Sequence, residues 1–163
     1  MFEKYLKIIL VLEGGYVNNK NDSGGSTNCG ITQVTFNNYL NKLKMKYRSV
    51  KFIRPEEIRN IYFANYWQGS NSDELCDKGF IKTALVHFDF AVNSGCGKAI
   101  TYLNKLHSTD FSSSINDDQK ASEYLELRED FYYKIAVGKN RVFLKGWLHR
   151  LNYIKEQIDK LSD

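Results

Sequence analysis

Two carboxylates near the start of the chain are spaced so that they could act together in acid–base chemistry. Glu13 precedes Gly14 and Gly15, and Asp22 follows in a stretch rich in Asn, Asp, Ser and Gly. Cleavage of a glycosidic bond needs a carboxylic acid that keeps its proton near neutral pH and a second group on the opposite face of the sugar. We expect Glu13 to be that acid, because the negative end of a helix and the neighbouring Leu12 both favour a protonated carboxyl.

Asp22 could reach Glu13 only if the intervening chain folds back on itself. Fully extended, the residues between them would span about 30 Å, whereas the two carboxylates of a glycosidase lie roughly 5 to 9.5 Å apart. Gly24 and Gly25 permit a folded-back loop, and Thr27 offers a hydroxyl that could hold a water molecule. The alternative role of Asp22 is an Asx turn, in which its side chain bonds only to the local backbone.

Three residues farther along the chain could contact a sugar. Tyr66 and Trp67 end a helical pattern and enter a polar loop, where aromatic rings can stack on sugar faces. Asn93 follows Asp89 by one helical turn and could exchange hydrogen bonds with an N-acetyl group. The alternatives are core positions for the two rings and a helix-end cap for Asn93. Asp89 lies in an apolar run, so we expect it to form a structural hydrogen bond or ion pair.

Neither the histidines nor the cysteines predict a metal or a cofactor. His87 and His149 lack the spacing of metal ligands, and Cys29, Cys76 and Cys96 form no C-x-x-C pair. The net charge of +4 suits an anionic partner such as a bacterial cell wall. The basic residues form no continuous block, so we do not expect nucleic acid as a partner.

The elements that must position these residues are predicted to be helical. A run from 80 to 92 is almost wholly apolar and predicts a buried central helix. Other helices are expected at 1–12, 34–43, 55–66, about 97–106 with Ser94 as its cap, 119–137 and 141–161. Polar breaks are expected at 68–79 and 108–118, and residues 16–32 should form a loop or a short irregular hairpin. We therefore predict a mainly α single domain over residues 1–163.

The chain carries no pattern typical of membrane insertion. No apolar run approaches the roughly 18 residues of a membrane span, and the first residues lack the cleavage site of a signal peptide. We expect a monomer made in the cytoplasm. To act on a wall in the periplasm or outside the cell, it would need a holin or a secretion machinery.

Read together, several segments resemble glycoside hydrolase family 108, which comprises lysozyme-like N-acetylmuramidases first described as secretion-activating proteins. The resemblance covers essentially the full chain in family order, and it rests on the segments 13–18, 22–32, 62–67, 88–95 and 143–150, together with Arg128, Phe131 and Tyr132. It implies a lysozyme-like helical fold, Glu13 as general acid and a glycan that contains muramic acid as substrate.

The order Glu13, Asp22, Thr27 is also similar to the catalytic order of some phage lysozymes. A bacteriolytic phage endolysin, an effector delivered into rival cells and a housekeeping enzyme that remodels the wall are all open as biological roles. The chain departs from the family at Ser23, where Pro is usual, and at Cys29, where an aromatic residue is common. Three functions are open at this point. They are a muramidase that cleaves the β-1,4 bond between N-acetylmuramic acid and N-acetylglucosamine, a lytic transglycosylase at the same bond, and a non-catalytic wall-binding module.

Overall fold

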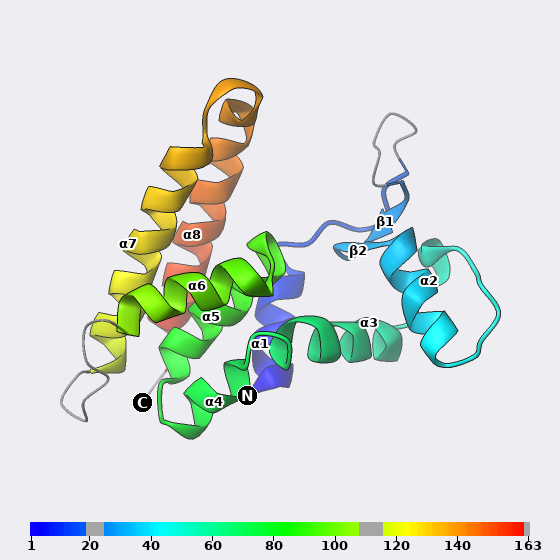
Figure 1. Ribbon diagram of the computed structural model, residues 1–163, viewed down its shortest axis with the longest axis horizontal. Helices are drawn as coiled ribbons and strands as arrows, with labels where there is room; N and C mark the ends of the chain where they lie inside the picture. The colour runs from blue at the N-terminus through cyan, green and yellow to red at the C-terminus, as the bar shows by residue number, and fades with distance from the viewer. Residues whose placement is uncertain (19–24, 108–115, 162–163) are drawn as a thin grey trace. The chain divides into compact units, whose positions relative to one another are not determined.

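The computed structural model describes residues 1–18, 25–107 and 116–161 (Figure 1). Asp22, one of the predicted site residues, lies outside the described residues. The chain divides into two compact units. The N-terminal unit comprises residues 3–64, and the C-terminal unit comprises residues 1–2 and the chain from Asn65 onward. The prediction of one domain over 1–163 stays a prediction.

The N-terminal unit combines short helices with a small hairpin. Its elements are α1 (Phe2–Leu10, whose first residue belongs to the other unit), β1 (Thr27–Asn28), β2 (Ile31–Thr32), α2 (Gln33–Lys42), the 3-10 helix η1 (Val50–Phe52) and α3 (Pro55–Tyr62). The Thr32 side chain caps α2 by accepting a hydrogen bond from the Thr35 N–H. Pro55 opens α3, as predicted, because the first turn of a helix does not need its missing N–H.

The hairpin confirms the short element predicted within residues 16–32. Strands β1 and β2 are antiparallel, with Thr27 opposite Thr32 and Asn28 opposite Ile31. The two residues between the strands, Cys29 and Gly30, have φ angles of 48° and 70°. Positive φ at both central residues is the signature of a type I′ turn, whose twist matches that of the flanking strands.

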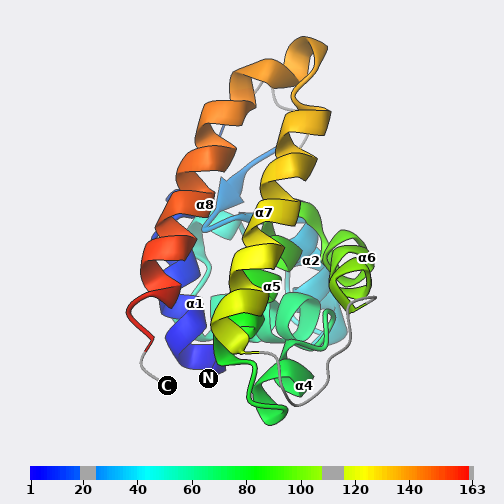
Figure 2. The ribbon, with the colours of Figure 1, turned by 90° about the vertical axis from the view of Figure 1, so that its left-hand side faces the viewer.

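The C-terminal unit is built around the predicted central helix. Its elements are the π-helix η2 (Phe63–Trp67, shared with the end of the other unit), α4 (Ser72–Asp77), α5 (Ile81–Ser94), α6 (Cys96–His107), α7 (Asp117–Ile135), the 3-10 helix η3 (Gly138–Phe143) and α8 (Leu144–Ile158). Helix α5 packs against α4, α6, α7 and α8, and α7 and α8 run side by side (Figure 2). Every residue of α5 from Lys82 to Ala91 is buried, which confirms the predicted buried helix.

The charged residues of α5 have partners, as their burial requires. Asp89 is fully buried, and its carboxylate accepts hydrogen bonds from Arg128 at 2.7 Å and from Arg150 at 2.9 Å. This confirms the structural ion pair expected for Asp89. His87 is structural too, because its two ring nitrogens lie 2.8 Å from the Tyr124 hydroxyl and 2.9 Å from the Ser70 carbonyl oxygen.

A carboxylate from another helix caps the start of α5. The Asp117 side chain accepts hydrogen bonds from the backbone N–H groups of Lys82, at 2.6 Å, and Thr83, at 3.0 Å. The Thr83 hydroxyl donates to the same carboxylate at 2.7 Å. The first turn of α5 therefore depends on α7 for its hydrogen-bond acceptor.

Three details of the helix prediction were wrong. Helix α1 ends at Leu10, and Leu12 forms only a following turn, in which its N–H donates to the Ile9 carbonyl at 2.9 Å. Helix α4 lies inside the predicted polar break, because a six-residue helix is too short to show a period. Ser94 ends α5 instead of capping α6, and Gly95, with a φ of 86°, separates the two helices. Among the described residues, no helix has the length and apolar character that a membrane span requires.

Candidate active site

Glu13 lies beyond the end of α1 in the N-terminal unit. Its side chain is half-buried, and it follows the turn that Leu12 forms after the helix. The negative end of α1 therefore acts on Glu13 less directly than predicted, because the dipole effect fades beyond the last helical turn. Gly14 and Gly15 do not end the helix, and neither has a positive φ. The environment of Glu13 must instead come from the residues that contact its carboxyl group.

Gly30, in the hairpin turn, lies directly against the Glu13 carboxyl group. A Cβ atom added to Gly30 would stand 2.6 Å from Glu13 Oε2 and 2.8 Å from the Tyr62 hydroxyl oxygen. Real Cβ atoms essentially never approach a heavy atom closer than 3.0 Å. A larger residue would displace the Glu13 carboxyl group, the Tyr62 hydroxyl or the turn, and the φ of 70° is one that other residues rarely adopt. The turn thus brings the Glu13 carboxyl and the Tyr62 hydroxyl together around one backbone atom.

Two hydrogen bonds hold the turn in this place. The Cys29 N–H donates to the Gly14 carbonyl at 3.0 Å, so the residue after Glu13 is bonded directly to the turn. The Tyr62 hydroxyl donates to the Cys29 carbonyl at 2.9 Å, and the Tyr62 side chain is buried at the end of α3. The chain on one side of the turn and a helix on the other therefore fix the position of Gly30 relative to Glu13.

The Cys29 thiol adds a neutral group to the surroundings of Glu13. Burial and, to a smaller extent, the negative charge of Glu13 raise the pKa of the Cys29 thiol above its ordinary value. The thiol therefore stays protonated near neutral pH.

Thr27 lies in β1, two residues before Cys29. Its backbone pairs with Val17 through two hydrogen bonds of 2.8 and 2.9 Å, so the chain does fold back between residues 17 and 27. The predicted second carboxylate, Asp22, lies outside the described residues. The structure therefore brings Thr27 into the same hairpin as the turn that contacts Glu13.

A comparison with protein-family models shows which family the chain belongs to. The sequence model of the glycosyl hydrolase 108 family matches residues 6–95, which include Glu13, Gly30, Tyr62 and Asn93. The chain belongs to glycoside hydrolase family 108. The resemblance read from the sequence is thereby confirmed, and the chain is a glycoside hydrolase of a family of peptidoglycan hydrolases.

A solved structure supports this assignment. The chain is similar to the protein in "Structure of Brucella abortus SagA", with a TM-score of 0.74 and 26% sequence identity. The match covers 96% of this chain and 92% of that chain. No curated protein sequence matches the chain. The mainly α, lysozyme-like fold is thus confirmed.

The predicted sugar-binding residues of this family 108 chain lie in the C-terminal unit and differ in exposure. Trp67 is only 5% exposed, and its ring packs at 5.7 Å from Phe2 and edge-on at 5.2 Å from Phe88. The groove position predicted for Trp67 was therefore wrong, because a ring enclosed by two other rings has no free face for a sugar. Tyr66 is half-buried and stays a candidate.

Asn93 is half-buried near the end of α5, and its amide is oriented by its neighbours. The amide oxygen accepts hydrogen bonds from the Tyr132 hydroxyl at 2.7 Å and from the Ser94 hydroxyl at 3.2 Å. Tyr132 also accepts a hydrogen bond from Arg128, which pairs with the buried Asp89. The predicted site residue Asn93 is thus attached to the ion-pair network of the core.

Two residues of the site were not predicted from the sequence. Gly30 carried a usable signal, because a glycine directly before a β-branched residue, in a stretch rich in turn residues, suits a tight hairpin. Tyr62 carried none, since its spacing marks only a buried position of α3, and its hydroxyl contact depends on the tertiary structure.

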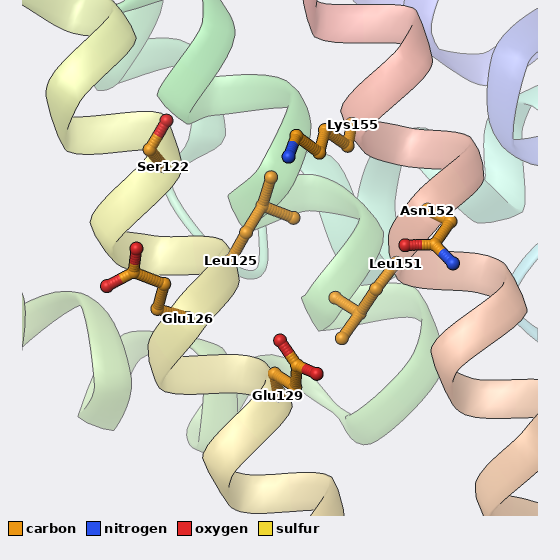
Figure 3. A pocket seen from close by; sticks show the side chains of 7 residues that line it. All are labelled: Ser122, Leu125, Glu126, Glu129, Leu151, Asn152 and Lys155. Carbon is orange, nitrogen blue, oxygen red and sulfur yellow. The ribbon is translucent and has the colours of Figure 1, made fainter.

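A pocket between α7 and α8 holds none of the predicted site residues. It is lined by Ser122, Leu125, Glu126 and Glu129 from α7 and by Leu151, Asn152 and Lys155 from α8. Figure 3 shows Leu125 and Leu151 pointing toward one another, with the charged groups of Glu129 and Lys155 beside them. Within the described part of the chain, no group of three or more His, Cys, Asp or Glu side chains could hold a metal ion.

Proposed function

We propose that this family 108 hydrolase is an N-acetylmuramidase that cleaves the β-1,4 bond between N-acetylmuramic acid and N-acetylglucosamine, with Glu13 as the general acid. The main support is the contact between the Glu13 carboxyl and Gly30. A half-buried carboxyl held against a tight turn keeps a fixed position, and a general acid must lie within hydrogen-bond reach of the oxygen that it protonates. Family membership supports the glycan as substrate.

In this proposal Glu13 gives its proton to the oxygen of the glycosidic bond. The bond between that oxygen and the anomeric carbon breaks, and positive charge develops on the sugar ring. A water molecule attacks the anomeric carbon and passes its proton to the second carboxylate, for which we propose Asp22. Thr27 would orient the water through its hydroxyl group. The hairpin joins Thr27 to the turn beside Glu13, which supports a shared role.

Asn93 and Tyr66 are the proposed contacts of the N-acetyl group and a sugar face. The amide oxygen of Asn93 is already bonded to Tyr132 and Ser94. Its two N–H groups are the part of the amide that can bind a ligand, so the proposed partner is the carbonyl oxygen of the N-acetyl group. A holin or a secretion machinery is the proposed partner in export.

The test compares reducing-end release from purified peptidoglycan by wild type, Glu13→Gln and Glu56→Gln. Loss of a general acid typically lowers the rate about 10²- to 10⁴-fold, so we expect that loss for Glu13→Gln. Glu56 is an exposed glutamate of α3, and its variant should keep wild-type turnover. Circular dichroism serves to check that both variants are folded. Unchanged wall lysis by Glu13→Gln would refute the assignment.

The mass of the products separates the proposed function from its alternatives. Hydrolysis adds one water molecule to the glycan fragments, whereas a lytic transglycosylase forms an anhydro sugar without adding water. Anhydro products would overturn the muramidase proposal but keep Glu13 as acid. Binding to peptidoglycan without release of reducing ends would instead indicate a wall-binding module.

A further inference from the structure

The connection between α7 and α8 concentrates positive charge. We call residues 134–145 the basic tip, and its basic residues are Lys134, Lys139, Arg141 and Lys145. The sequence has no Asp or Glu anywhere from 131 to 155. Across the described residues, no ion pair joins any of the four cations to a carboxylate. The basic tip is therefore a locally cationic surface in a chain whose remaining charges nearly balance.

Large apolar side chains are exposed at the same place. Val137 is 67% exposed, Val142 is 76% exposed and Phe143 is 55% exposed. Isolated exposed apolar residues are common on protein surfaces, but a cluster on one short segment is typical of an interaction site. Figures 1 and 2 show the turn between α7 and α8 extending beyond the ends of α5 and α6. The basic tip can thus reach a surface before the rest of its unit does.

Aromatic rings connect this apolar cluster to the core of the unit. The Phe143 ring lies 5.9 Å from Trp147, and Trp147 stacks on Tyr132 at 5.4 Å with an interplanar angle of 21°. Tyr132 is buried and bonded to the core through Arg128 and Asn93. The exposed residues are therefore presented on a rigid base.

A groove beside the basic tip combines the same two properties. Leu144 and Leu148 give it an apolar lining, and Arg141, Lys145 and His149 place basic groups along it. An apolar lining next to cations suits a molecule with a phosphate group joined to a hydrocarbon chain. A soluble polyanion would use the cations but would leave the leucines and valines exposed to water.

We propose that the basic tip docks on an anionic phospholipid surface. Basic residues attract the negative headgroups, and exposed valine and phenylalanine side chains enter the boundary between headgroups and acyl chains. The binding is peripheral, which agrees with the finding that no helix among the described residues could span a membrane. It would hold the enzyme at the membrane that borders its wall substrate.

Vesicle co-sedimentation tests the contribution of charge. The probes are large unilamellar vesicles of phosphatidylglycerol with phosphatidylethanolamine and vesicles of phosphatidylcholine alone, at about 0.1 M salt. We expect binding to the first and little to the second. Each basic residue near an anionic membrane strengthens binding about fivefold, so Lys139→Gln/Arg141→Gln should weaken it about 25-fold. The control Lys42→Gln/Lys46→Gln removes the same charge from exposed positions of the N-terminal unit and should bind as wild type does.

A second pair of variants tests the apolar contribution. Val137→Ser/Val142→Ser keeps every charge of the basic tip and should weaken binding to the anionic vesicles about tenfold. The control Val11→Ser/Val34→Ser changes two valines that are 69% and 65% exposed in the other unit, and it should leave binding unchanged. Thermal unfolding checks that each variant is folded.

Three results would overturn the proposal. They are no binding to the anionic vesicles, equal binding to phosphatidylcholine vesicles, and full binding by the Val137→Ser/Val142→Ser variant. The last result, together with competition by soluble polyphosphate, would indicate an anionic polymer as the partner. The vesicles contain no glycan, and Glu13→Gln should bind them like wild type, so this test is independent of the proposed catalytic function.

Discussion

Replacement of Gly30 by alanine tests the geometry of the site more sharply than removal of the acid itself. The new Cβ would stand 2.6 Å from Glu13 Oε2, whereas ordinary contacts begin at 3.4 Å. The carboxyl group or the turn must therefore move by roughly 0.8 Å. A displacement of about 1 Å in a catalytic group can lower a rate about 10²-fold, and we expect a loss of that size for Gly30→Ala. Alanine in the left-handed region also costs about 1 to 2 kcal/mol of stability.

Gly79→Ala is the matched control for this experiment. Gly79 has a φ of 84°, and an added Cβ would meet nothing within 4 Å. Gly79→Ala should therefore lose a similar amount of stability in urea unfolding and keep wild-type release of reducing ends from peptidoglycan. Only Gly30→Ala should lose both stability and activity on peptidoglycan. If folded Gly30→Ala releases reducing ends as fast as wild type, the contact between Gly30 and Glu13 does not position the acid.

Three further predictions concern stability. Burial alone would raise the pKa of Glu57, but hydrogen bonds from the Arg48 side chain and a backbone N–H outweigh burial and lower it. The contribution of Glu57 to stability is thus present above the ordinary carboxyl pKa and lost as the pH falls, so Glu57→Gln should flatten the acid branch of a plot of thermal unfolding temperature against pH. Asp89→Asn should lower the free energy of unfolding by about 3 to 5 kcal/mol in urea, because it leaves the buried Arg128 charge uncompensated. Cys29→Asn should raise the thermal unfolding temperature, with a gain of up to about 1 kcal/mol, because asparagine suits a type I′ turn.

Each of these three predictions has a control or an opposing result. If wild type and Glu57→Gln lost stability in parallel on acidification, the interaction between Arg48 and Glu57 would not be the cause of the acid branch. Asp130→Asn changes an exposed aspartate of α7 and should leave stability unchanged. Cys29→Ser removes the thiol without easing the backbone, so a gain equal to that of Cys29→Asn would show that the turn conformation is not the cause.

The fold followed from the sequence wherever an element was long enough to show a period. The almost wholly apolar run of α5 predicted its burial directly, whereas α4 and the two-residue strands were too short for any pattern to appear. The end of α1 was placed too late because Leu12 continues the apolar spacing of the helix. In the structure its N–H bonds to the carbonyl of Ile9, which is the bond of a turn.

The sequence predicted only those parts of the site that residues adjacent along the chain define. Glu13 could be chosen from its position before two glycines, but its contact with Gly30 and Tyr62 depends on how the hairpin meets α3. For Trp67, the same aromatic pattern suits a groove and a core. The rings of Phe2 and Phe88, which come from distant parts of the chain, decide between them.

Asp117 of α7 caps the start of α5, so the acceptor for the first turn of α5 is synthesised after α5 itself. While the ribosome has not yet delivered α7, the N–H groups of Lys82 and Thr83 lack the carboxylate that accepts their hydrogen bonds in the finished protein. The central helix of a nascent chain is therefore frayed at its start, and it becomes complete only when Asp117 emerges.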